Sequence, residues 1–442
     1  MLQENGYSIR RVRSRAAGVL TAALISLFPA AANATMGTEG FRVTRADVVA
    51  AAAHTPRRSS RTALRASALR TPALRTPALR APALRAPVLR TSAPVSRAPA
   101  SAGADATLIA AHEWADYKAR FLAPDGRLID RENRGISHSE GQGYGMILAM
   151  HAGDREAFDR IWGFTRRALQ IRGDSLLAWR YDPATTPRVT DINNASDGDI
   201  LVAYALLRAA VKWNAADYAK AGDDIVQAIG EQLIGWDNGK PILKPGAAGF
   251  DRMEGNRGPV VNLSYYFYAA FDLFAVVQPR FPWAELAAHG RELTAKARFG
   301  HRNLVPDWVS VSRGDLTIAR GFAKRASYDA VRIPLYMAYA SMTGFDMSAQ
   351  DAAWNRNGSG APKARDLITD VAEEMNDPGY RMVAALSACS TRRAPIPAHL
   401  QSYRSTTYFA SSLHMLGLVA ARKAGLCDNA STAVMIGSRT AR

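Results

Sequence analysis

The sequence predicts an all-α domain in which two concentric layers of helices surround the core. Helical patterns follow one another from Thr107 onward, and several are apolar on nearly every side. A helix that is apolar all round lies inside a large structure, so these segments predict layers rather than a simple bundle. Strand-like alternation is scarce and short, as at Asp307–Ser312, and no G-x-G-x-x-G motif opens a βαβ unit. The missing motif argues against a nucleotide-binding fold.

Apolar residues recur with the helical period in ten segments of the chain after Thr107. The expected helices span about 107–121, 141–151, 155–171, 198–213, 215–234, 262–277, 283–297, 328–343, 363–375 and 403–421. The loops between them are rich in Gly, Asn, Asp and aromatic residues. We expect these loops to line one end of the helical layers.

The helix that follows Asn194 is the most strongly apolar of the set. Ser196 and Asp199 fit a capping box, which predicts that the helix starts there and makes Asp199 a capping residue. Asp197 then lies in the first turn, where free backbone N–H groups and the helix dipole favour a negative charge. Since the capping box does not need Asp197, a functional role is favoured for this carboxylate.

The N-terminal residues have the pattern of an export signal. Basic residues at 10–15 precede an apolar run at 16–28 and a small-x-small site at Ala32–Ala34. The apolar run is short for a membrane span, so we expect a signal peptide over residues 1–34. The alternative is an uncleaved anchor.

Residues 35–106 have low complexity, and a five-residue unit containing Leu-Arg repeats from Ala63 to Arg90. Its recurring Pro prevents a helix from propagating, and little apolar surface can be buried. We therefore expect a disordered cationic tether. A solvated linker is the favoured interpretation, and binding to an acidic surface or anionic polymer is the alternative. The domain proper is expected over 107–442.

Most of the formal charge of +17 belongs to the N-terminal arm. Residues 1–106 carry 16 Arg, no Lys and four acidic residues, for a net charge of +12. The remainder is only mildly basic, which is weak evidence for a nucleic-acid partner, and none is expected.

The cysteine and histidine content argues against metal and nucleophile chemistry. Cys389 and Cys427 are the two cysteines, too few for a disulfide scaffold or a Cys-based zinc site. Whether they pair with each other stays open. The sequence contains no H-E-x-x-H motif and no G-x-S-x-G motif. We expect no metal and no cofactor.

Two further carboxylate stretches lie at predicted helix starts. Glu140 lies in Ser137–Met146, where glycines at 141, 143 and 145 suit close packing or an approaching ligand. The alternative for Glu140 is a capping box with Ser137. Asp329 lies three residues before Arg332 among apolar neighbours, so a carboxylate kept ionised by Arg332 would suit a general base.

Aromatic side chains lie in or near the same loops. Planar rings beside carboxylates suit a sugar-binding cleft, because pyranose faces are apolar and their edges form hydrogen bonds. The candidate substrate-binding residues are Tyr144, Trp179, Tyr181, Tyr265, Trp308, Tyr328 and Arg332.

Three separated motifs, in order, resemble glycoside hydrolase family 8. NASDGDILVAYALLRAAVKW resembles the family signature, SEGQGYGM its proton-donor motif and SYDAVRIPLY its third acidic motif. Stretches such as WADYKARFLAPDGRLID (114–130) and VPDWV (305–309) resemble the cellulase that accompanies bacterial cellulose synthase. The resemblance covers about residues 107–421 and leaves out the N-terminal arm.

The resemblance implies an (α/α)6 toroid that cleaves internal β-1,4 bonds of a glucan with inversion. It implies that Glu140 is the general acid, Asp329 the base that activates water, and Asp197 a residue that holds the sugar. An acid and a base must differ in protonation at one pH. We expect a raised pKa for Glu140 in its weakly charged segment, and an ionised Asp329 beside Arg332.

These observations lead to one expected function and several alternatives. The expected protein is a periplasmic or secreted monomeric endo-β-1,4-glucanase without a stable membrane span. It would act in cellulose biosynthesis and could associate with the synthase complex. The alternatives are hydrolysis of xylan, chitosan or mixed-linkage glucan, or a non-catalytic glucan-binding subunit.

Overall fold

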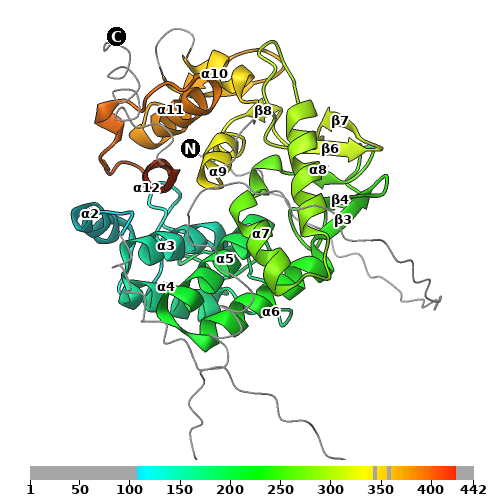
Figure 1. Cartoon of the computed structure of the whole chain (residues 1–442). Helices are drawn as coiled ribbons and strands as arrows, with labels where there is room; N and C mark the ends of the chain where they lie inside the picture. The colour runs from blue at the N-terminus through cyan, green and yellow to red at the C-terminus, as the bar shows by residue number, and fades with distance from the viewer. Residues whose placement is uncertain (1–106, 342–345, 356–359, 425–442) are drawn as a thin grey trace, which may run out of the picture. The chain divides into compact units, whose positions relative to one another are not determined.

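The computed structural model describes residues 107–341, 346–355 and 360–424 (Figure 1). The expected signal peptide and tether lie outside these residues and remain predictions. Cys427 also lies outside them, so its pairing with Cys389 stays open. Cys389 is buried on a helix within the described part. In this part of the chain, no helix is long and apolar enough to cross a membrane.

An inner set of helices packs side by side in chain order. These helices are α3 (Ser139–Ala152), α5 (Ser196–Trp213), α7 (Tyr268–Val277), α9 (Arg332–Tyr339) and α12 (Tyr408–Ala424). Each packs against the next, and α12 packs back against α3, so the inner helices close into a ring. Every residue of α9 is buried, as are most residues of α3 and α5. The nearly complete apolar surface of these segments follows from this position.

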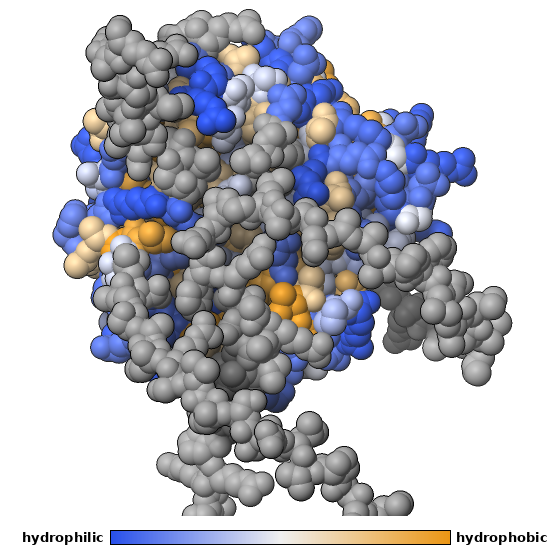
Figure 2. Space-filling model, viewed as in Figure 1, coloured by the Kyte–Doolittle hydropathy of each residue, from blue (hydrophilic) through white to orange (hydrophobic). Residues whose placement is uncertain are grey.

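Outer helices cover this ring. They are α2 (Ala111–Phe121), α4 (Arg155–Ala168), α6 (Ala216–Gln232), α8 (Trp283–Lys296), α10 (Ser348–Asn355) and α11 (Pro378–Arg392). In α4, Phe158 and Ile161 point inward, whereas Arg160 and Arg166 are exposed. Hydrophilic residues accordingly form much of the described surface visible in Figure 2. The prediction of two helical layers is confirmed.

Short antiparallel strands connect the helices. The pairs are β1 (Ser137–His138) with β2 (Arg180–Tyr181), and β3 (Ile234–Asp237) with β4 (Lys240–Leu243). One three-stranded sheet has the order β5 (Val260–Val261), β6 (Val309–Ser312), β7 (Asp315–Ile318). The other has the order β10 (Ala372–Glu374), β9 (Lys363–Asp366), β8 (Arg325–Ala326). The β3–β4 hairpin and β6–β7 lie near α8 in Figure 1.

The expected helix over 363–375 is wrong, since these residues form β9 and β10. Asp366 ends β9, and its carboxylate accepts hydrogen bonds from the N–H groups of Ile368 and Thr369. This local capture of backbone donors favours a turn over a helix. The expected helix over 262–277 begins later, at Tyr268, because Asn262 caps the short 3-10 helix η1 (Leu263–Tyr265). A second 3-10 turn, η2, spans Ala398–Leu400.

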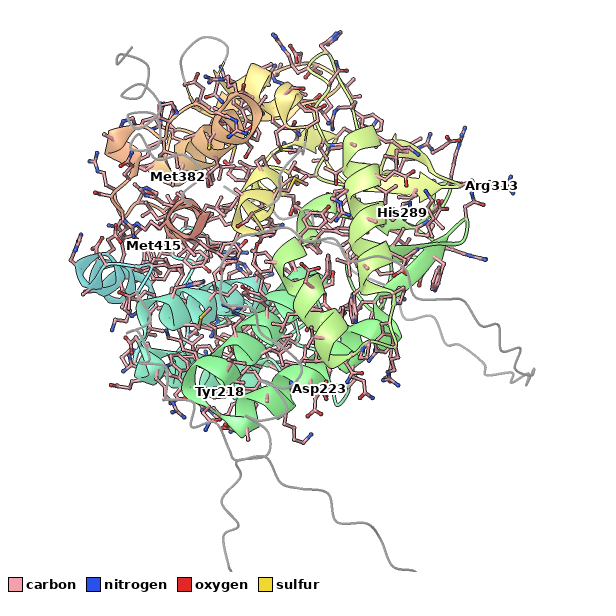
Figure 3. All side chains as sticks on the ribbon, viewed as in Figure 1. Tyr218, Asp223, His289, Arg313, Met382 and Met415 are labelled. Atoms are coloured by element: carbon pink, nitrogen blue, oxygen red, sulfur yellow. The ribbon has the colours of Figure 1, made fainter. Side chains whose placement is uncertain are left out.

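Small residues allow the closest helix contacts. A Cβ atom on Gly143 of α3 would lie 2.5 Å from the Cβ of Leu201 on α5, so only glycine permits this approach. Likewise, a Cβ atom on Gly417 of α12 would lie 2.6 Å from the Cγ of Met382 on α11. Figure 3 shows Met382 and Met415 on these two neighbouring helices.

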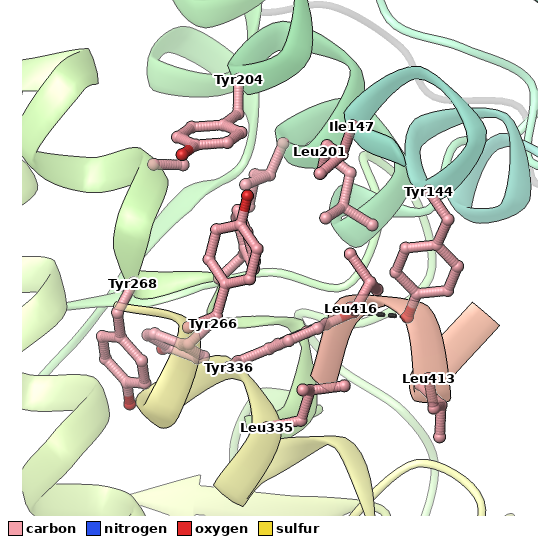
Figure 4. Close-up of a cluster of buried hydrophobic side chains, with 14 of the residues drawn as sticks. Tyr144, Ile147, Leu201, Tyr204, Tyr266, Tyr268, Leu335, Tyr336, Leu413 and Leu416 are labelled. Atoms are coloured by element: carbon pink, nitrogen blue, oxygen red, sulfur yellow. Dashed lines mark hydrogen bonds between the residues drawn. The ribbon is translucent and has the colours of Figure 1, made fainter. Parts of the chain in front are cut away.

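Buried tyrosines bring hydroxyl groups into the core. Tyr144 on α3 and Tyr336 on α9 meet with their hydroxyl oxygens 2.5 Å apart, as the dashed line in Figure 4 marks. Both rings are fully buried, and burial raises the pKa of Tyr336 to about 12. The hydroxyls therefore stay protonated and act as hydrogen-bond partners.

Candidate active site

The N-terminal ends of three inner helices bring the predicted carboxylates together. Glu140 and Asp197 are the second residues of α3 and α5, and Asp329 lies just before α9. The free backbone N–H groups and dipole of a helix N-terminus favour negative charge at each position. Arg332, the first residue of α9, stands among all three carboxylates.

The Arg332 guanidinium joins these carboxylates through its two terminal nitrogens. Nη1 donates to Glu140 Oε1 and, at 3.0 Å, to Asp197 Oδ2, while Nη2 donates to Asp329 Oδ1 at 2.7 Å. The side chain of Arg332 is 3% exposed. A planar guanidinium with fixed donors suits several carboxylates at once, which a point charge such as an ammonium does not.

Ser264 and Asn262 set the orientation of Arg332. Nη2 also donates to Ser264 Oγ at 2.8 Å, and that hydroxyl donates to Asn262 Oδ1 at 2.7 Å. Tyr265 places its ring 5.4 Å from the guanidinium, a cation–π distance. The turn that contains η1 thus helps to hold the central cation in place.

Burial raises the pKa of two of the carboxyl groups. It raises the pKa of Asp197 to about 7, against a hydrogen bond from the Gly198 N–H that lowers it. Burial, followed by the nearby charges of Asp307 and Asp197, raises the pKa of Asp329 well above its ordinary value. Both carboxyl groups therefore retain a proton to higher pH than an exposed aspartate does.

Glu140 is held by two donors. Besides Arg332, the Tyr144 hydroxyl donates to Glu140 Oε1 at 2.8 Å. From the sequence we expected weakly charged surroundings for Glu140 and an ion pair of Arg332 with Asp329 alone. The structure corrects that prediction, because one cation serves both groups.

The expected capping boxes are absent from the described helices. Ser196 Oγ is buried without a hydrogen-bond partner, and Asp199 instead accepts from Leu177 N at 2.8 Å and Asn194 Nδ2 at 2.7 Å. The prediction of Asp199 as a cap is wrong, because this carboxylate ties two loops to α5. Ser137 likewise donates to the Leu128 carbonyl, and so does not cap Glu140's helix.

A cleft of about 320 Å³ opens beside these groups. Glu140, Asp329 and Arg332 line it, whereas Asp197 is 3% exposed and reaches the cleft only through Arg332. Further acidic residues line its walls, namely Asp130, Glu132, Glu374 and Asp377. Burial raises the pKa of Asp130 to about 6. Carboxylates outnumber cations along the cleft wall, so an anionic ligand would be repelled.

The candidate aromatic residues fall into three groups. Tyr328 lines the cleft, and Trp179, Tyr181, Tyr265 and Trp308 are half-buried. Tyr144 is fully buried, so it supports Glu140 rather than presenting a face to a ligand.

Trp308 is the centre of an aromatic stack beside the acidic groups. It stacks on Phe322 at 4.2 Å and on Phe250 at 5.9 Å, and Tyr265 meets its edge at 5.9 Å. His138 lines the cleft and stacks on Trp179 at 6.3 Å. Burial and the charge of Arg180 lower the pKa of His138 to about 4, so it is neutral near pH 7.

Several cleft residues were missed from the sequence. They are His138, Asn133, Asn376, Tyr380, Tyr408 and Phe409, besides the four acidic wall residues. Asp130 ends one of the stretches that carried the family resemblance, a signal that could have found it. The others lie in connecting segments or at helix ends that come together only in the folded chain. No group of three metal-binding side chains with suitable geometry occurs in residues 107–424 outside the two short gaps.

The cleft is open, lies at one end of the helical ring and is flanked by aromatic rings. It holds acidic groups on a shared arginine. These are the features of a carbohydrate-cleaving hydrolase. The sequence comparison agrees, because the family model described as "Glycosyl hydrolases family 8" matches residues 90–423. The chain belongs to this family, and the (α/α)6 toroid predicted from the resemblance is confirmed.

Named relatives carry the comparison further. A probable endoglucanase of Novacetimonas hansenii is 39% identical over 305 residues, 67% of this chain and 87% of that protein. An endoglucanase of Cellulomonas uda is 38% identical, with 51% of this chain and 62% of that protein aligned. Among solved structures, the endo-β-1,4-glucanase CMCax of Acetobacter xylinum has a TM-score of 0.65 at 34% identity, covering 73% of this chain and all of that one.

Proposed function

We propose that the chain is an inverting endo-β-1,4-glucanase. The observation that carries the proposal is the convergence of Glu140 and Asp329 on Arg332 within one cleft. The names of the relatives, endoglucanase and endo-β-1,4-glucanase, support cellulose-type glucan as the substrate. Intact carboxylates at all three positions argue against a non-catalytic binding subunit.

In the proposed mechanism, Glu140 protonates the oxygen of the scissile glycosidic bond as that bond breaks. Asp329 takes a proton from a water molecule whose oxygen attacks the anomeric carbon from the opposite face. Arg332, which lines the cleft, holds the sugar ring and the two reacting carboxyl groups in place, and buried Asp197 acts on the ring through Arg332. After product release, the proton gained by Asp329 and the one lost by Glu140 are exchanged through solvent, which completes the cycle.

The decisive experiment compares the wild type with E140Q and D329N on carboxymethyl cellulose and cellohexaose. We expect each variant to lose at least a hundredfold in kcat while its binding of cellohexaose stays measurable. E231Q, on an exposed ion pair with Arg280, is the matched control and keeps full activity. Hydrolysis by E140Q at the wild-type rate would reject the assignment. Parallel assays on xylan, chitosan and lichenan distinguish the alternative substrates.

We further propose an exported enzyme with a role in cellulose biosynthesis. The N-terminal pattern of residues 1–34 supports export. The resemblance of residues 114–130 and 305–309 to the cellulase that accompanies bacterial cellulose synthase supports the role in cellulose biosynthesis. The proposal includes a periplasmic or secreted location, a monomeric state, and action either alone or with the synthase complex. Mass spectrometry of the protein recovered outside the cytoplasm should show a new N-terminus after about Ala34. An intact Met1 in that fraction would contradict the signal.

A further inference from the structure

Asp307 is a buried carboxylate that the mechanism above does not use. It lies just before β6 and is 5% exposed. Its Oδ1 accepts from Ser327 N at 2.7 Å and from Ala330 N at 2.9 Å, and its Oδ2 accepts from Ser327 Oγ. Burial raises the pKa of Asp307, whereas these three donors act against that shift by stabilising the ionised form. The same donors fix the segment that supplies them.

The three donors lie on both sides of Asp329 in the chain. Ser327 precedes Asp329 by two residues, and Ala330 follows it directly. The Asp307 backbone N–H also donates to the Arg325 carbonyl at 2.8 Å, which ties the two segments together. Asp329 therefore sits between two residues whose backbone N–H groups are held by the Asp307 carboxylate.

Asp307 also acts on Asp329 through its charge. After burial, the Asp307 carboxylate is the next largest cause of the raised pKa of Asp329, ahead of the Asp197 charge. Among the described residues, the other charged or titratable groups that face Asp329 are Arg332 and Tyr336 of α9, Asp197 of α5 and Tyr265 of η1. The Asn262 amide and the Trp308 indole favour its charged form. Arg332 and Asp307 therefore act in opposite directions on the same group.

We propose that Asp307 is a positioning residue for Asp329: it clasps both ends of the Ser327–Ala330 turn and places a second negative charge behind the base. This inference rests on the proposed function, because it assigns Asp307 to the group that would activate water. It predicts that the effect of Asp307 is on proton acceptance and kcat rather than on substrate binding.

The test is the pH dependence of kcat/KM for cellohexaose hydrolysis by D307N. Asn keeps the Oδ1 acceptor for both backbone donors and removes the charge. The acid limb, where Asp329 must lose its proton, should move to lower pH by about one unit, because a nearby like charge raises a carboxyl pKa. KM should stay within about twofold of the wild type, since a residue acting through the base does not contact substrate.

Asp237 offers a matched control. It is 8% exposed and accepts from Arg313 N at 2.8 Å and Gly314 N at 2.7 Å, a clasp on a hairpin away from the described cleft residues. Figure 3 shows Arg313 at the edge of the structure. D237N should leave the acid limb in place. If D307N loses kcat with its acid limb coincident with those of the wild type and D237N, the role of Asp307 is structural and the proposal is overturned.

S327A provides a second variant should D307N fail to fold. It removes one donor to Asp307 and frees one end of the turn, so we expect about a tenfold loss in kcat at constant KM, corresponding to one hydrogen bond. A kcat equal to that of the wild type overturns the clasp. A wild-type protein inactive on every β-1,4-glucan overturns the proposed function and this inference together. An active wild type with unchanged variants overturns the inference alone.

Discussion

Replacing Arg332 by Met tests the central cation most directly. The substitution keeps much of the side-chain length and removes the charge shared by three carboxylates. Glu140 and Asp329 are 20% and 29% exposed at their side chains, so cleft water can solvate them. Asp197 is 4% exposed and would be left as a buried, unpaired charge. Breaking a buried ion pair in this way costs about 3–5 kcal/mol of unfolding free energy.

The loss of unfolding free energy in R332M should depend on pH, and the structure gives the sign of this dependence. Burial raises the pKa of folded Asp197 to about 7, above its ordinary value of 3.8, so the folded protein holds a proton that the unfolded chain releases. This group therefore lowers stability as pH rises from about 4 to 7, and removal of Arg332 raises the folded pKa further. The deficit of R332M should grow toward pH 8 and fall toward zero at pH values where Asp197 is protonated in both proteins.

Urea unfolding followed by tryptophan fluorescence measures this deficit at about pH 5 and about pH 8. R280M is the control, because the Arg280–Glu231 pair is exposed at 54% and 47% and such pairs contribute at most about 1 kcal/mol. A deficit for R332M below about 1 kcal/mol at pH 8, or one that is equal at both pH values, would refute the assignment of Arg332 as the counter-ion of buried Asp197.

Three further outcomes follow from the structure. Y144F removes the hydroxyl that donates to Glu140 Oε1, and it should lower kcat about tenfold at constant KM, as expected for one hydrogen bond; an unchanged kcat would rule out this support. Burial raises the pKa of Glu113, but Arg422 and the backbone donors outweigh burial and lower it to about 2. The stability that Glu113 contributes is therefore present above pH 4.5 and lost as pH falls toward 2, and acid unfolding of E113Q should lack this component. The acidic cleft should weaken binding of anionic carboxymethyl cellulose at low salt, so its KM should fall as ionic strength rises toward about 0.1 M, while KM for neutral cellohexaose stays constant.

Helix positions were predictable because the information that sets them is local. Apolar periodicity placed α3, α4, α5, α6 and α8 to within a few residues of their observed bounds. The predictions of a helix over 363–375 and of a cap at Asp199 failed, because there a side chain hydrogen-bonds to backbone or side-chain groups outside a helix. Asp366 turns the chain at the end of β9, and Asp199 bonds Leu177 and Asn194 rather than its own helix end.

The acidic groups of the site were predictable because helix N-termini mark where carboxylates gather. Glu140, Asp197 and Asp329 were all located from sequence, and the structure brings them together on Arg332. The three-residue spacing of Asp329 and Arg332 suggested an isolated ion pair between these two residues. Sequence spacing reveals only neighbours along one helix. The sharing of Arg332 among three helices, and the clasp of Asp307 on a turn 20 residues away, arise only from tertiary structure.

The division of labour within the cleft has a consequence for how such a protein can be altered. The reacting groups lie in or just before the first turns of inner helices, whereas Asp130, Glu374 and Asn376 reach the cleft from outside those helices. Loops tolerate replacement better than the elements they connect. Exchanging the cleft-lining loops should therefore reshape ligand choice while the acid, the base and their arginine keep their register. The helical scaffold would then keep the same reacting groups while the loops around the cleft are exchanged.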